Sequence, residues 1–271
     1  MPSGPQTEGE QVAREVGLAL LEISSTYERR VIRPQAGPAT LAIVGLVARQ
    51  RRFLRGAYLL ADAGQRLEAS ILLRAMLEFL IRQTWLQSNP ELNYTLWVLD
   101  DLEARLRIDR EIREQSEDEH GQALEVMEPG TRSLYEDSLA DARRQIDALH
   151  QRLGLDRTPR YPNLREQAQA VGLSFSYSLA YRFDSLSAAH PSAMAVEQLF
   201  AQHPQGVRVL ADPPPERGYA DPYSVGAFIL REALGHAAEQ IPELALEGLD
   251  ELSARLDAVR PGGDLAAPSH D

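Results

Sequence analysis

The sequence predicts an all-α protein of about nine helices. Apolar residues recur at three- and four-residue spacing over most of the chain, and Pro and Gly stand where helices would start or end. Only GVRVL at 206–210 suggests a strand. With 271 residues, 44% of them hydrophobic, the chain can bury a sizeable core. We expect one helical domain over 10–260, and disordered ends at 1–9 and 261–271 because they lack apolar anchors.

Four long helices are expected in the N-terminal half. Residues 10–33 carry apolar side chains at helical spacing and end at a Pro. Pro suits the first helical position, because its missing N–H is not needed there, so helices should begin near Pro38 and Pro90. Gly64 separates the second helix from the third. The expected spans are 10–33, 38–63, 66–87 and 90–119.

In the C-terminal half, capping residues and prolines set the helix ends. Asn163 and Ser174 can accept hydrogen bonds from the first turns of two helices. Pro191 ends the second of these, because the residue before Pro disfavours helical geometry. The expected spans are 131–153, 164–172, 174–190, a short helix to about 202, 222–240 and a last helix to about 259.

The composition excludes several classes of chemistry. The chain has no Cys, so it holds no disulfide, no thiolate nucleophile and no Cys-ligated zinc. It has no Lys either, because all 28 basic residues are Arg, which excludes pyridoxal-phosphate chemistry and a P-loop. The GxSxG, HExxH and GxGxxG motifs are absent from the sequence. We therefore expect no cofactor.

The ends and the net charge bear on location and partners. The N-terminus is polar and acidic, unlike a signal peptide, and no apolar run reaches the roughly 18 residues of a membrane span. We expect a soluble cytoplasmic protein without a membrane partner. A net charge of −12 argues against indiscriminate nucleic-acid binding, although a local Arg patch can override that field.

A narrow polar stripe crosses the otherwise apolar helix 66–87. Arg74 and Glu78 belong to it, and we expect them to form a direct salt bridge or to share one polar cavity. One interpretation is a structural ion-pair ladder, and the other is a charged site that lines a cleft. Buried ion pairs add little net stability, so stability alone explains the stripe poorly.

Arg74-Ala-Met-Leu-Glu78 after a Gly-containing turn, and a later Tyr…Leu-Ser…His-Pro-Ser segment that holds Tyr181 and His190, resemble a bacterial family of uncharacterised helical proteins, domain of unknown function 5677. The resemblance covers about residues 40–240. It implies an all-α fold in which Arg74, Glu78, Tyr181, Ser187 and His190 converge. The chemistry of His itself makes His190 a candidate acid/base. Independently of the family, His190 in a last helical turn is also explained by the helix dipole.

The chain also resembles HEPN-type ribonucleases, which are small, helical and bacterial and pair an Arg with a His a few positions later. Arg231 and His236 fit that spacing in an apolar helix. The resemblance implies a metal-independent enzyme that acts on RNA or a nucleotide in a toxin or defence context. The structural alternative is a surface Arg beside a partly buried His.

Two further patterns complete the candidate sites. Glu117-x-x-His120 and Asp147-x-x-His150 have the spacing of di-iron ligands but lie in solvated runs, so we expect no metal. Arg49, Arg51, Arg52 and Arg55 cluster beside Phe53 and could bind phosphates, with Arg49, Arg52 and Arg55 as the candidate phosphate ligands, or they could form a solvated face.

Two functions remain open at this point. The first is a HEPN-like enzyme that acts on RNA or a nucleotide, with Arg74 or Arg231 stabilising charge and His190 or His236 as acid/base. The second is a non-enzymatic helical interaction protein, whose buried Arg, Glu and His groups are structural and whose partner is another protein or a second copy.

Overall fold

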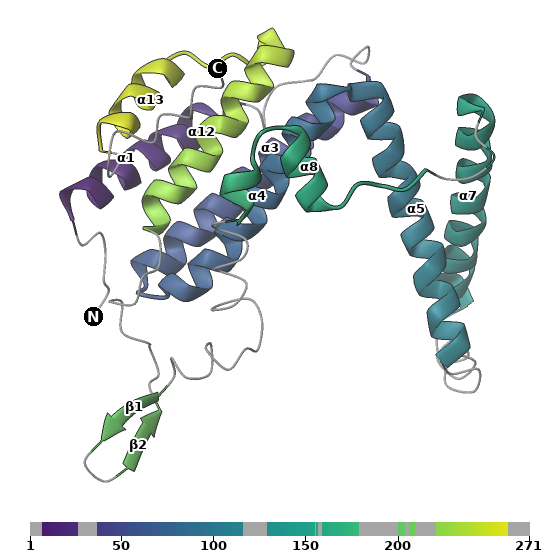
Figure 1. Ribbon diagram of the computed structural model, residues 1–271, viewed down its shortest axis with the longest axis horizontal. Coiled ribbons are helices and arrows are strands. Elements are labelled where there is room, and N and C mark those ends of the chain that lie inside the picture. The colour runs from purple at the N-terminus through teal and green to yellow at the C-terminus, as the bar shows by residue number, and fades with distance from the viewer. Residues whose placement is uncertain are drawn as a thin grey trace. The chain divides into compact units, whose positions relative to one another are not determined.

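The computed structural model describes residues 7–26, 37–115, 129–154, 156, 159–178, 200–203, 206–209 and 221–259, and Figure 1 shows its helices and strands. The all-α class is confirmed, because the described residues contain nine α-helices and a single two-stranded hairpin. The chain divides into two compact units, one formed by Met1–Ser88 with Asn163–Asp271 and the other by Asn89–Pro162.

The larger unit is a bundle built around α4 (Arg66–Ser88). This helix packs against α3 (Pro38–Asp62), α12 (Pro222–Gln240) and α8 (Leu164–Ala170), which explains why its sequence is apolar on nearly every side. A fifth helix, α1 (Glu8–Ile23), packs mainly on α12 and on α13 (Leu249–Ala258). Figure 1 shows α1, α12 and α13 lying side by side, so segments from both ends of the chain share one core.

Short elements complete the larger unit. They are α9 (Ser174–Ser176), the 3-10 helix η3 (Pro242–Leu244), and the strands β1 (Phe200–His203) and β2 (Gly206–Val209). The two strands pair antiparallel, with Phe200 opposite Val209 and His203 opposite Gly206.

The smaller unit is an antiparallel pair of helices, α5 (Pro90–Gln115) and α7 (Pro129–Leu153). Among its described residues, Leu99 and Leu102 from α5 form a hydrophobic core cluster with Ala142 and Ile146 from α7. Tyr135 donates a hydrogen bond of 2.6 Å to the buried carboxylate of Asp109 and ties the far end of the pair together.

Helix starts follow the local signals that the sequence contains. Asn163 and Glu166 form a reciprocal capping box at the start of α8. Asp221 accepts hydrogen bonds from the backbone N–H groups of Tyr223 and Ser224 and caps α12, whose first residue is Pro222. Gly154, with a φ of 64°, follows α7 in the left-handed conformation that favours glycine.

Two expectations differ from the structure. The first helix ends at Ile23 and not near residue 33, because Ser24 caps it and donates from its hydroxyl to the carbonyl of Leu20. Residues 200–203 form a strand and not the end of a helix, because they pair with the strand candidate that the sequence does show. The predicted helix over 174–190 is described only as far as residue 178, and the predicted disordered ends lie outside the described residues except for 7–9, where Thr7 caps α1.

Candidate functional site

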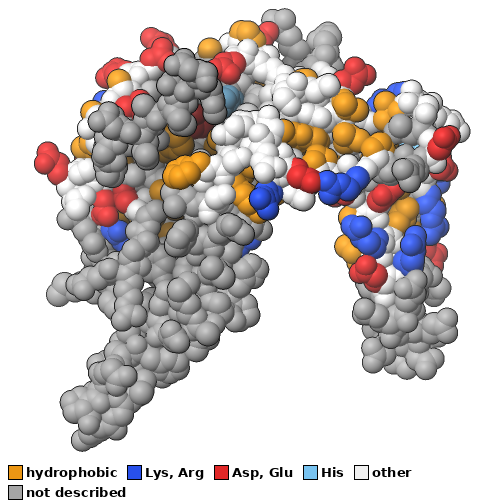
Figure 2. Space-filling model, in the orientation of Figure 1, with side chains coloured by type: hydrophobic (Ala, Val, Ile, Leu, Met, Phe, Trp, Pro, Cys, Tyr) orange, Lys and Arg blue, Asp and Glu red, His pale blue; other side chains and the backbone are white. Residues whose placement is uncertain are grey.

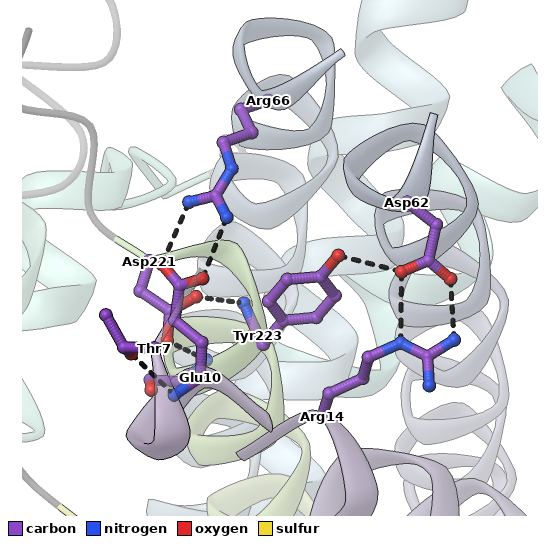
Figure 3. Close-up of polar contacts among 8 residues, drawn as sticks. Thr7, Glu10, Arg14, Asp62, Arg66, Asp221 and Tyr223 are labelled. Atoms are coloured by element: carbon purple, nitrogen blue, oxygen red, sulfur yellow. Dashed lines mark hydrogen bonds and ion pairs between the residues drawn. The ribbon is translucent and has the colours of Figure 1, made fainter. Parts of the chain in front are cut away.

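A group of charged side chains in the larger unit lies where the ends of four helices meet (Figure 3). Arg14 of α1 donates two hydrogen bonds to Asp62, the last residue of α3. Its Nε donates to Oδ1 at 3.0 Å and its Nη2 donates to Oδ2 at 2.7 Å. This bidentate geometry matches the fork of guanidinium to the two oxygens of one carboxylate.

A second bidentate pair joins α1 to α4. Arg66, the first residue of α4, donates from Nη1 and Nη2 to the two carboxylate oxygens of Glu10 at 2.9 and 2.8 Å. The Arg66 and Glu10 side chains are only 11% and 12% exposed, so solvent screens this pair weakly. Thr7 accepts the backbone N–H of Glu10 at 3.1 Å and fixes the first turn that carries it.

Tyr223 of α12 links the two pairs. Its hydroxyl donates to Oδ1 of Asp62 at 2.7 Å, and the Arg66 guanidinium lies 5.9 Å from its ring centre. Tyr58 of α3 donates from its buried hydroxyl to the Tyr223 backbone oxygen at 2.9 Å, and the two rings meet edge to face at 5.2 Å. We call Glu10, Arg14, Asp62, Arg66 and Tyr223 the helix-end cluster.

The pKa shifts in the helix-end cluster follow from these contacts. The hydrogen bond from Arg14, aided by that from Tyr223, lowers the pKa of Asp62 despite partial burial. Burial and the bond to Asp62 raise the pKa of Tyr223. Burial is also the main cause of the raised pKa of Tyr58. Each group is therefore held in its ordinary charge state at neutral pH, unlike a general acid or base that is tuned toward pH 7.

The predicted pair on α4 is present. Arg74 Nε lies 3.3 Å from Oε1 of Glu78, as the sequence predicts. The Arg74 side chain is 14% exposed, but that of Glu78 is 40% exposed, so the pair lies at the edge of the core. The catalytic role of Arg74 and Glu78 stays a prediction.

The HEPN-like pair on α12, Arg231 and His236, does not form one shared site. Arg231 donates to Glu232 at 2.7 Å and to Asp257 at 2.5 Å, and its guanidinium lies 4.7 Å from the ring centre of Phe228. His236 lies near Glu239, with 3.5 Å between Nδ1 and Oε2. Five positions on a helix turn through about 500°, which leaves the two side chains about 140° apart. A phosphate at Arg231 would have to displace two carboxylates.

Arg49, Arg52 and Arg55 are all exposed along α3. Arg49 lies 5.3 Å from the ring centre of Phe53, which itself meets Phe79 of α4 at 5.5 Å. Within the part of the chain that the structure describes, none of these three guanidinium groups forms an ion pair with a carboxylate.

Tyr181, Ser187 and His190 lie outside the described residues, as do Glu117 and His120. Asp147 and His150 lie on α7. No group of three or more metal-ligating side chains comes together among the residues that the structure describes. No helix in the described ranges is long and apolar enough to cross a membrane.

Sequence reasoning placed Arg51 in the arginine cluster of α3, which is wrong because Arg51 is buried, and it missed two buried polar contacts. Arg51, only 1% exposed, donates to Oγ of Ser24 at 2.7 Å and to the carbonyl of Leu21 at 3.0 Å, so a cation caps the C-terminal end of α1. Gln50 donates to Gln83 at 2.9 Å, which donates to the Ala233 carbonyl at 2.8 Å. Polarity at core-facing positions was their only sequence signal.

The family model that matches this chain is the family of unknown function DUF5677, over residues 40–207. That range is more than half of the 271 residues. The chain belongs to this family. No curated protein and no solved structure matches the chain.

Some of the candidate residues lie inside the family match over residues 40–207 and others lie outside it. It includes α3, α4 and the positions of Arg74, Glu78, Tyr181 and His190, whereas Arg231 and His236 lie beyond it. The helix-end cluster is also split, because Asp62 and Arg66 lie inside the family range and their partners Glu10, Arg14 and Tyr223 lie outside it.

Proposed function

We propose that this chain is a non-enzymatic helical interaction protein, whose paired charges hold its helices together and whose α3 arginines contact an anionic partner. One observation carries the proposal, namely the contrast between two sets of arginines. Arg14, Arg66 and Arg231 are each engaged by carboxylates. Arg49, Arg52 and Arg55 are exposed on α3, inside the family range, without such partners among the described residues.

The physical argument is one of charge placement. A chain of net charge −12 has many acids with which an exposed arginine could pair. Three arginines within seven residues that stay exposed create a local positive potential on an acidic protein. Such a patch attracts carboxylates or phosphates and speeds association with an anionic surface.

Heparin chromatography tests the anionic contact. Arg52→Glu/Arg55→Glu should elute from immobilised heparin at clearly lower salt than the wild type, because two attractive charges become repulsive. Arg107→Glu/Arg110→Glu is the matched control, since both arginines are exposed on α5 with the same three-residue spacing. Equal elution of the wild type and the α3 variant would refute the contact.

The alternative function is a metal-independent enzyme that acts on RNA or a nucleotide, with His190 as its acid/base. It rests on the family motif around Tyr181 and His190. Total RNA incubated with the protein, with and without EDTA, separates the two functions. EDTA-resistant cleavage that is lost in His190→Ala would overturn the non-enzymatic proposal, and loss only in His236→Ala would support the HEPN-like pair.

A further inference from the structure

The outward side of α3 carries a stripe that combines arginines with exposed apolar residues. Leu41 and Leu59 are 48% and 66% exposed, and Gly45, Arg52 and Arg55 are exposed between them. The spacing of three, four or seven residues keeps these positions on one side of the helix. We call Leu41, Gly45, Arg49, Arg52, Arg55 and Leu59 the basic stripe.

The outward side of α1 carries the complementary pattern. Its exposed positions alternate at three- and four-residue spacing, and Leu18 among them is 42% exposed. We call Glu8, Gln11, Glu15, Leu18 and Glu22 the acidic stripe. Figure 2 shows acidic side chains along the edge of the larger unit where α1 and α13 lie.

Both stripes lie on the same side of the α1/α3 pair. The two helices run antiparallel, because Arg14 meets Asp62 at one end and Arg51 meets Leu21 at the other. At about 100° per residue, each stripe lies roughly a quarter-turn from the side that faces the other helix. Because antiparallel helices are viewed from opposite ends, these two rotations lead to the same side.

We propose that this side is an interface between two copies of the chain, in which the acidic stripe of each copy packs on the basic stripe of the other. A two-fold axis would form the contact twice with one self-complementary surface. The pairing places Glu side chains against free Arg side chains and buries Leu18, Leu41 and Leu59. This inference rests on the proposed interaction role and names its partner.

The mixture of arginines and exposed leucines in the basic stripe favours a second copy of the chain over a phosphate-bearing ligand as its partner. Phosphates would pair with the arginines but would leave Leu41 and Leu59 in water. The acidic stripe supplies carboxylates and an exposed leucine on a helix of similar periodicity. Net charge opposes association of two acidic chains, but salt at physiological concentration screens charges beyond about 8 Å and leaves close pairs effective.

Charge exchange between the stripes tests the proposal on the full-length chain. We expect the wild type to dimerise in sedimentation equilibrium and light scattering at physiological salt, and less at high salt, where the close pairs are also weakened. Arg52→Glu/Arg55→Glu on α3 and Glu8→Arg/Glu22→Arg on α1 should each weaken self-association at least about tenfold, because each reverses the net charge of its stripe and sets like charges against each other. An equimolar mixture of the two variants should recover the dimer, since only the mixed pair has opposite charges at both contacts.

The α5 variant is the control for self-association, and two results would overturn the proposed interface. Arg107→Glu/Arg110→Glu should dimerise like the wild type. A wild type that stays monomeric at high micromolar concentration, or a mixture that fails to recover the dimer, would overturn the interface. Retention on heparin by a monomeric wild type would leave the proposed anionic contact intact, whereas RNA cleavage would overturn the interaction role without affecting the dimer.

Discussion

Replacing Asp62 with Asn measures what the helix-end cluster contributes to stability. Asp62 accepts two hydrogen bonds from Arg14 and one from Tyr223, at 2.7 to 3.0 Å. A hydrogen bond to a charged group contributes about 1.5–3 kcal/mol. The Asp62 side chain is 33% exposed, so solvent screens its contacts. The three hydrogen bonds together should therefore contribute about as much as one such bond, and not three times as much. We expect Asp62→Asn to lower the free energy of unfolding by about 2 kcal/mol, or the Tm by about 4–8 °C.

The pH dependence gives the same prediction an independent test. The folded pKa of Asp62 is lowered, so its stabilisation is fully present above the unfolded Asp pKa of about 3.9 and is lost as the pH falls through the folded value. The difference between wild type and Asp62→Asn should therefore be constant near neutrality and shrink below about pH 4. Urea unfolding followed by circular dichroism across this range measures it.

A control and a coupled variant sharpen the result. Glu15→Gln removes an ion pair with Arg255 whose side chains are about half exposed, so it should change stability by no more than about 0.5 kcal/mol. Tyr223→Phe should be less costly in the Asp62→Asn background than in the wild type, because the two share one hydrogen bond. A difference under about 0.5 kcal/mol between Asp62→Asn and wild type at pH 7 would refute the reasoning.

Four further substitutions should change the free energy of unfolding by different amounts, measured by the same unfolding assay. Gly17→Ala should lose about 1–3 kcal/mol, because its Cβ would lie 1.9 Å from the Tyr58 hydroxyl, whereas Gly45→Ala should gain about 0.5–1 kcal/mol, because no atom lies within 4 Å of the new methyl. Arg51→Met should cost about 1–3 kcal/mol, since it leaves the Leu21 carbonyl and the Ser24 hydroxyl without their buried donor. Arg74→Ala should cost under about 1 kcal/mol and not the 3–5 kcal/mol of a buried pair, because Glu78 remains 40% exposed and can be solvated.

Local signals explain which helices the sequence predicts well. Pro38, Pro90 and Asp221-Pro222 mark starts that the structure reproduces, because the physical requirement of a first turn is met by adjacent residues. The strand at 200–203 lacked such a signal. Its backbone hydrogen bonds depend on β2, and without that partner the same residues fit a helix end equally well.

The contacts of the candidate site were predictable only where they are local. Arg74 and Glu78 lie one helical turn apart, so their spacing alone predicts the pair. The members of the helix-end cluster are far apart in sequence, with 48 residues between Arg14 and Asp62 and 56 between Glu10 and Arg66. No periodicity connects such positions, and only the packing of α1 against the ends of α3 and α4 brings them together.

The sequence nevertheless contains an indirect sign of these distant partners. Asp62 ends α3 and Arg66 begins α4, so each charge lies at the unfavourable end of its own helix dipole. An isolated helix would be stabilised by the opposite charge at each position, which means that local energetics argue against both residues. Arg14 and Glu10 reverse that balance, because a bidentate ion pair outweighs the few tenths of a kcal/mol at stake in the dipole. A charge that opposes its own helix dipole is therefore a reason to look for a tertiary partner of opposite sign, and Arg, the only cation besides His in this chain, can supply that partner with two hydrogen bonds at once.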